Sequence, residues 1–70
     1  MRDVTITREP VELYKILKFE GLVDSGGRAK TVIADGLVTV NGEVETSKRR
    51  KIVNGDILNF AQEQLLIRLC

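Results

Sequence analysis

The chain has 70 residues, a length at which folding buries only about 60% of the surface that the unfolded form exposes, so one small domain over residues 1–70 is expected. Hydrophobic residues make up 43% and charged residues 30%, which is typical of globular domains and unlike disordered or fibrous chains, and the net charge of +1 favours no class of partner. The lack of histidine and the single cysteine, Cys70, exclude an intrachain disulfide, a Cys/His zinc site and histidine-based catalysis.

No apolar run approaches the roughly 20 residues that a membrane-spanning helix needs. The first ten residues, MRDVTITREP, carry charges where a signal peptide would have its apolar segment. We therefore expect a cytoplasmic protein with no membrane association. The composition also gives no reason to expect a cofactor or a metal, and an enzyme is not expected.

A short strand and a helix are predicted at the beginning of the chain. The sequence VTIT at 4–7 alternates apolar and polar residues, as a half-buried strand does. Pro10 suits the first turn of a helix, where its missing N–H would have had no partner. The apolar residues that follow have the spacing of one buried helical stripe: Leu13, Ile16 and Leu17. Gly21 supplies a helix end, so a helix is predicted over 10–20.

A second helix is predicted over 26–35, between Ser25 and Gly36. The Ser25 hydroxyl suits the N-cap position, where it accepts a hydrogen bond from a first-turn amide. Its buried stripe is Ala29, Val32 and Ile33. The pair Gly26–Gly27 costs this helix about 1 kcal/mol per residue relative to alanine. The pair is explained either by the geometry of the loop-to-helix junction or by close approach of a partner to the backbone.

The second half of the chain has the period of two that is typical of strands. The segment LVTV ends at Asn41-Gly42, a strong signal for a type I′ hairpin. It is followed by EVET, KIV, DILNF and LLIRL, with a second Asn-Gly pair at 54–55 and a polar AQEQ turn between them. We therefore predict an α+β fold in which two helices pack on a small, mostly antiparallel sheet. The further residues expected in the core are Val38, Val40, Ile52, Ile57, Phe19 and Phe60.

Four consecutive cations, KRRK at 48–51, interrupt this series of strands. Adjacent like charges repel one another, and the nearest acidic residues are Glu43 and Glu45. In a strand only two of the four side chains would face one partner, whereas in a loop all four could. A surface for an anionic partner explains the run better than an incidental solvated turn does.

The segment from Gly21 to Leu58 resembles the S4-type RNA-binding domain. That family has a G-L-x-x-S connection, a helix of the form A-x-x-x-I-x-x-G, then V-x-V-N-G and V-x-x-G-D-x-I. The matching positions are Gly21, Leu22, Ser25, Ala29, Ile33, Gly36, Val38, Val40, Asn41, Gly42, Val53, Gly55, Asp56 and Ile57. The chain departs from the pattern at Gly26 and Lys30, where many members have arginine. The resemblance is closest to the short stand-alone S4-like proteins of bacteria.

The resemblance implies the S4-like fold and RNA binding, without the catalytic activities of larger family members. The residues expected to bind RNA are Lys15, Lys18, Ser25, Arg28, Lys30, Lys48, Arg49, Arg50 and Lys51. Only three aromatic residues are present, with Tyr14 left open between a contact and a partly buried position, so recognition of structured RNA by shape and phosphate is expected. Ribosomal RNA or transfer RNA would be a suitable structured target. Neutralising four phosphates would give a salt slope of roughly −3.

Less specific interpretations exist for single residues and for the whole chain. Lys15 and Lys18 suit a solvated helix face, with Glu12 in reach of Lys15, and Arg28 could pair with Asp24. The main alternative function is a protein-interaction module, in which the basic strip docks on an acidic partner and a free sheet edge adds a strand. A third is a subunit that supplies RNA affinity to another protein's catalytic site. We expect a monomer, with a protein partner in a ribonucleoprotein as a further possibility.

Overall fold

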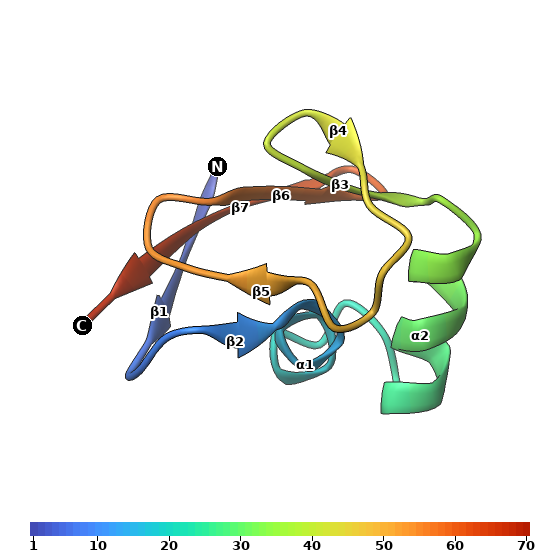
Figure 1. Cartoon of the computed structure of the whole chain (residues 1–70), viewed down its shortest axis with the longest axis horizontal. Coiled ribbons are helices and arrows are strands. Elements are labelled where there is room, and N and C mark those ends of the chain that lie inside the picture. Colours follow the sequence, from blue (N-terminus) through green and yellow to red (C-terminus); the bar gives the residue numbers. More distant parts are fainter.

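The computed structural model describes all 70 residues and has the predicted α+β fold (Figure 1). Its elements in chain order are β1 (Arg2–Ile6), β2 (Val11–Glu12), α1 (Leu13–Phe19), α2 (Gly26–Ala34), β3 (Val38–Val40), β4 (Glu43–Val44), β5 (Lys51–Ile52), β6 (Ile57–Phe60) and β7 (Glu63–Leu69). A five-stranded sheet forms one layer, α1 lies beneath it, and α2 stands at one end of the molecule. Neither helix has the length and apolarity needed to cross a membrane.

The five-stranded sheet has the order β1-β7-β6-β3-β4. Its neighbours are antiparallel except for β1 and β7, which run parallel with Val4 opposite Ile67. The β3–β4 hairpin turns at Asn41 and Gly42, whose φ angles of 54° and 87° are the positive values predicted for this turn. The sheet is therefore mostly antiparallel, as expected from the sequence.

A second, two-stranded sheet was not expected. Strand β2 pairs antiparallel with β5, so that Val11 lies opposite Ile52. The prediction that the first helix begins at Pro10 is wrong: Pro10 follows a cis peptide bond, the next two residues are β2, and α1 begins at Leu13. Pairing with a strand forty residues away prevailed over a local signal for a helix start. The second helix ends at Ala34, one residue short of its predicted end.

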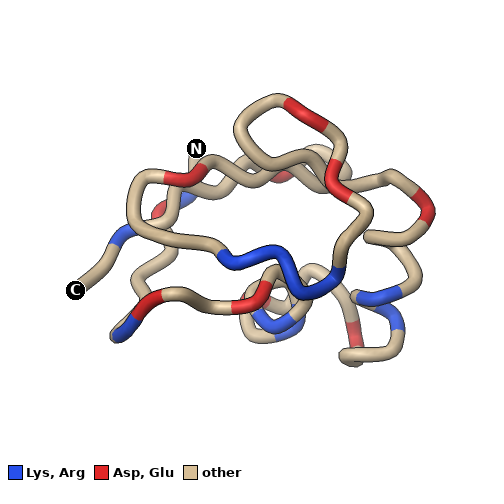
Figure 2. The backbone as a smooth tube through the Cα atoms, in the orientation of Figure 1, with Lys and Arg blue, Asp and Glu red and all other residues tan.

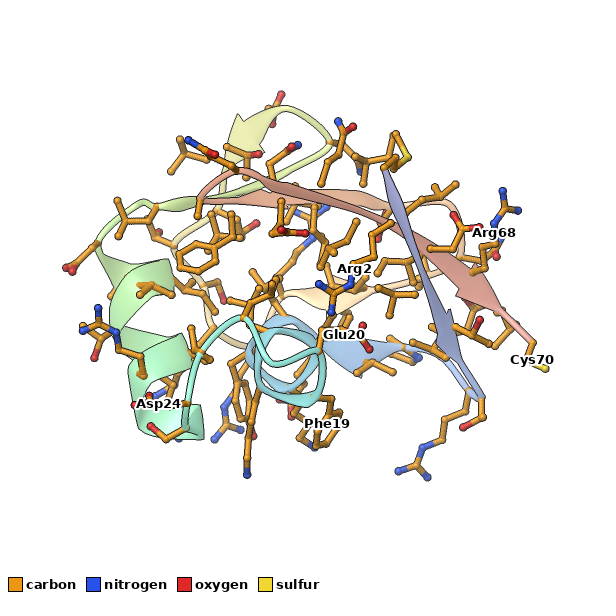
Figure 3. The ribbon with its side chains drawn as sticks, turned by 180° about the vertical axis from the view of Figure 1, so that it is seen from behind. Arg2, Phe19, Glu20, Asp24, Arg68 and Cys70 are labelled. Atoms are coloured by element: carbon orange, nitrogen blue, oxygen red, sulfur yellow. The ribbon has the colours of Figure 1, made fainter.

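The core consists of fourteen buried residues, all apolar, including both predicted helical stripes. Phe19 was expected in the core, but 71% of its surface is exposed, because the short helix α1 ends there and the ring points outward (Figure 3). Phe60 is half-buried and packs against the core. Ile57 is also only half-buried, and its neighbour Leu58 is the fully buried residue of β6.

Asn41 joins two turns that lie far apart in the sequence. Its side chain donates a hydrogen bond to Asp56 (3.1 Å) and accepts one from the amide of Ile57 (2.9 Å). Asp56 in turn accepts from the amide of Val53 (2.9 Å). The Asn-Gly and Gly-Asp motifs that carry part of the S4 resemblance therefore have structural roles in these turns.

Candidate nucleic-acid interface

The KRRK run forms a turn followed by a strand. The amide of Arg50 donates to the carbonyl oxygen of Ser47 (3.2 Å) and closes a turn with Lys48 and Arg49 at its centre. Central turn residues project from the surface, whereas Arg50 follows the turn and Lys51 is the first residue of β5. We call residues 46–50 the basic turn. All four cations are exposed, two of them at the tip of the turn, one after it and one in the strand.

The basic turn is fixed to the beginning of α1. The amide of Leu13 donates to the carbonyl oxygen of Arg50 (2.9 Å), and the amide of Tyr14 donates to that of Lys48 (3.2 Å). These two first-turn amides have no partner within their own helix, so the turn supplies acceptors for them. A segment of mostly exposed, charged residues is thereby held by backbone hydrogen bonds.

Glu45 holds the turn from its other side. Its carboxylate accepts hydrogen bonds from the amide of Ser47 (3.0 Å) and from the guanidinium of Arg50 (2.7 Å). The hydrogen bond from Ser47, followed by that from Arg50, lowers the pKa of the Glu45 carboxyl below its ordinary value of 4.5. Arg50 is therefore engaged within the protein, and its role in RNA binding stays a prediction.

An open cleft of about 530 Å³ separates α2 from the basic turn. The residues that line it are Lys30, Thr31, Ala34, Thr46, Ser47, Lys48 and Arg49. Three of them are cations and none is acidic, so the cleft attracts anions. The Thr31 hydroxyl donates to the carbonyl oxygen of Gly27 (3.1 Å), and the hydroxyls of Thr46 and Ser47 have no partner within the protein. Cations and free hydroxyl donors together suit a phosphate group.

Tyr14 lies between two of the predicted cations. The ammonium group of Lys30 is 5.1 Å from the centre of the Tyr14 ring, and that of Lys15 is 6.0 Å from it. The ring is half-buried and packs against the core, so it is a fixed support for both groups. The sequence left open whether Tyr14 is a contact residue or a partly buried one. In the structure its ring packs against the core and also supports two cations of the basic surface.

The other predicted residues lie in α1 and at the beginning of α2. The Ser25 hydroxyl accepts from the amide of Arg28 (3.1 Å), which confirms Ser25 as the N-cap of α2. The side chain of Lys18 runs beside Gly26, 3.9 Å from the place where a Cβ would lie. Arg28 forms no ion pair, with Asp24 or any other residue. Figure 2 shows the cations of α1, α2 and the basic turn in the same half of the molecule.

Several residues of the surface were missed or undervalued in the sequence. Thr46 and Ser47 immediately precede the cationic run, and their polar, turn-forming character was a signal that they share its surface. Glu12 was assigned only to Lys15; it does pair with Lys15 (3.2 Å) but also approaches Arg49 (4.0 Å). That second contact joins residues far apart in the chain, so no local sequence pattern predicts it.

A second groove, of about 620 Å³, lies on the other side of α1 between that helix, β1 and β2. Its walls include Val4, Ile16 and the exposed ring of Phe19, together with Arg8 and Glu20. Glu12 and Lys15 also line it, so the groove contains charges of both signs as well as apolar side chains. The groove therefore lacks the uniform positive lining of the cleft beside α2.

Comparison with known proteins gives a consistent result. The family described as "S4 domain" matches residues 4–68. "Putative RNA-binding protein YbcJ" of Escherichia coli K12 is 55% identical over 62 residues, which cover 87% of this chain and 89% of that protein. "Probable ribosome maturation protein RlbA" of Bacillus subtilis 168 is 33% identical over 57 residues, covering 81% and 80%. The solution structure of E. coli YbcJ, described as revealing an "ALFAL motif involved in RNA-binding", superposes with a TM-score of 0.74 at 43% identity, covering 97% of this chain and 87% of that one.

Proposed function

This chain belongs to the S4 domain family, and from this premise we propose that it is a non-catalytic RNA-binding protein that takes the backbone of a structured RNA into the cleft between α2 and the basic turn. Relatives named as RNA-binding support the class of ligand. Ribosomal RNA is the first natural candidate, because one relative is named as a ribosome maturation protein, and transfer RNA is the second.

The convergence of Lys30, Lys48 and Arg49 on one cleft is the observation that carries this proposal. These cations come from two segments that are nearly twenty residues apart in the chain, and hydrogen bonds to α1 fix the position of the second segment. With Lys15, which lies beside the Tyr14 ring and pairs with Glu12, four cations contribute to the proposed surface. Neutralising four phosphates corresponds to a salt slope of roughly −3.

Recognition by shape is favoured over recognition of unpaired bases. Binding of single strands without structure relies on exposed aromatic rings on which bases stack. None of the residues that line the cleft is aromatic, the Tyr14 ring is half-buried, and Phe19 lines the opposite groove. The surface offers charges and hydroxyl donors, which contact phosphates and 2′-hydroxyls.

Binding without catalysis is supported by the side chains of the cleft. General acid–base catalysis needs a group that takes up or releases a proton near the operating pH. The cleft contains lysine, arginine, threonine and serine, with no carboxylate, histidine or cysteine. Such groups attract and orient an anion.

The proposal is tested by fluorescence anisotropy of the wild-type protein with a hairpin RNA, a single-stranded RNA and a duplex DNA, each at about 50 and about 200 mM salt. Tightest binding to the hairpin, weakened on the order of fifty-fold between the two salt concentrations, is the expected result. Equal binding to all three would contradict the preference for structured RNA. No binding to any of them at low salt would contradict the function and favour a protein partner, for which the free edges of β1 and β4 are available.

A further inference from the structure

One carboxylate lies among the cations of this surface. Glu12 has its Oε1 3.2 Å from the ammonium nitrogen of Lys15 and its Oε2 4.0 Å from Nε of Arg49. Lys51 is its partner across the β2–β5 pair. Two cations from different segments of the chain therefore contact a single anionic group, and the backbone of a third lies opposite it in the strand pair.

The Glu12 side chain has no role in capping α1. Glu12 occupies the N-cap position, but its side chain makes no hydrogen bond to the helix, and the first-turn amides of Leu13 and Tyr14 are used by the basic turn. The carboxylate is therefore held by the cations alone. Both ion pairs are partly exposed, and the contact with Arg49 is longer than a hydrogen bond, so both exchange readily with another anion.

We infer that the Glu12 carboxylate occupies an anion site between α1 and the basic turn that a phosphate group of the RNA takes over on binding. Glu12 is then a competing anion that limits RNA affinity. The site adjoins the cleft, since Arg49 belongs to both. This inference rests on the proposed function for the identity of the ligand, while the site itself rests on the two ion pairs and the strand register.

The test compares Glu12→Gln with Glu43→Gln. Both substitutions raise the net charge by one unit, but Glu43 is an exposed residue without an ion pair in β4, the edge strand of the five-stranded sheet, which lies at the top of Figure 1, whereas α1 lies beneath the sheet. We expect Glu12→Gln to bind the hairpin RNA about fivefold more tightly than the wild type, with a salt slope steeper by about 0.7 to 0.9. Glu43→Gln should change the affinity less than twofold.

A second readout uses inorganic phosphate as the probe and needs no RNA. Chemical shifts of the Arg49 Nε–H group and of the Lys15 amide are followed during a phosphate titration. In Glu12→Gln these signals should saturate at a phosphate concentration several-fold lower than in the wild type or in Glu43→Gln. Adding Lys15→Gln to Glu12→Gln should abolish that gain, and a melt by circular dichroism verifies that each variant is folded.

The outcomes separate the two proposals. Equal phosphate titrations in the wild type, Glu12→Gln and Glu43→Gln would overturn the inference, whatever RNA does. If the phosphate titrations differ as expected but no RNA binds, the site stands and the proposed function fails. If RNA binds to the wild type and Glu12→Gln gains no more than Glu43→Gln, the function stands and Glu12 is a structural ion-pair partner only.

Discussion

The ammonium group of Lys30 lies 5.1 Å from the centre of the Tyr14 ring, and this contact joins α2 to α1 at the edge of the basic cleft. A cation over an aromatic face is attracted to it, and at partly exposed sites the attraction is worth about 0.5 to 1 kcal/mol. The ring is held by the core, so Lys30 is held in turn. Tyr14 thus links the packing of the fold to the position of a cation that faces the cleft.

Replacing Tyr14 separates the effect of its ring from that of its hydroxyl. Tyr14→Phe should keep RNA affinity within about twofold, because the aromatic face remains. Tyr14→Leu should weaken binding two- to fivefold, since Lys30 loses its support. Anisotropy titration measures both, and a thermal melt verifies that the leucine variant is folded. Equal affinities of the two variants would show that the ring does not position Lys30.

Two substitutions in α1 test the position found for Phe19. Phe19→Gln should change the free energy of unfolding by no more than about 0.5 kcal/mol, because most of the ring is exposed. Leu17→Ala, at a fully buried position two residues earlier, should cost about 2 to 5 kcal/mol. Urea denaturation measures both. A large loss in Phe19→Gln would place the ring in the core, as its sequence context first suggested.

Acid should loosen the basic turn through Glu45. The pKa of Glu45 is lower in the folded protein than its ordinary value of 4.5, so the folded state is favoured by its ionised form. That contribution is complete above about pH 4.5 and is lost as the pH falls through the lowered pKa. Carboxyl chemical shifts in an NMR titration should show Glu45 with a midpoint below 4.5.

The Arg50→Gln variant provides the control for that titration. It removes the guanidinium and leaves the amide of Ser47, the larger cause of the shift, in place. The midpoint of Glu45 should therefore rise only part of the way back to 4.5. An unchanged midpoint would show that Glu45 and Arg50 do not pair in solution.

Neighbouring atoms leave room for a Cβ at both glycines at the beginning of α2, so steric crowding does not require glycine there. A Cβ at Gly27 would have the Ser25 hydroxyl oxygen as its closest neighbour, at an ordinary 3.9 Å, and neither Gly26 nor Gly27 has a positive φ. Gly27→Ala should therefore raise the free energy of unfolding, by up to about 1 kcal/mol. Thermal and urea melts test this, and a decrease would indicate strain at the junction. RNA titration of the same variant then tests close approach of a partner to this backbone.

The sequence predicted best those features that depend on neighbouring residues. The second helix, its Ser25 cap and the Asn41-Gly42 hairpin follow from local geometry, and all three are found. The pairing of β2 with β5 was missed because it joins two-residue strands that are far apart in the chain. The same pairing displaced the start of α1, and the early end of this helix left Phe19 outside the core.

For the candidate site, the sequence indicates which cations are present but not how they are arranged. The run at 48–51 identified a cationic surface, and the S4 resemblance added Lys30 to it. Which cations act together depends on tertiary contacts: Lys48 and Arg49 meet Lys30 across the cleft, whereas Arg50 is held by Glu45. The carboxylate of Glu12 is engaged by Arg49 through the fold, and sequence spacing shows only its pair with Lys15.

The most direct test of the cleft as the RNA site is an anisotropy titration of a hairpin RNA with two double variants of equal charge. Lys48→Gln/Arg49→Gln removes two cations of the cleft, and Arg8→Gln/Arg68→Gln removes two outside it, with Arg68 on β7, away from α2 (Figure 3). We predict a more than tenfold loss of affinity and a salt slope shallower by about 2 for the first variant, and a change of less than threefold for the second. Equal losses in the two folded variants would contradict the assignment of RNA binding to this cleft.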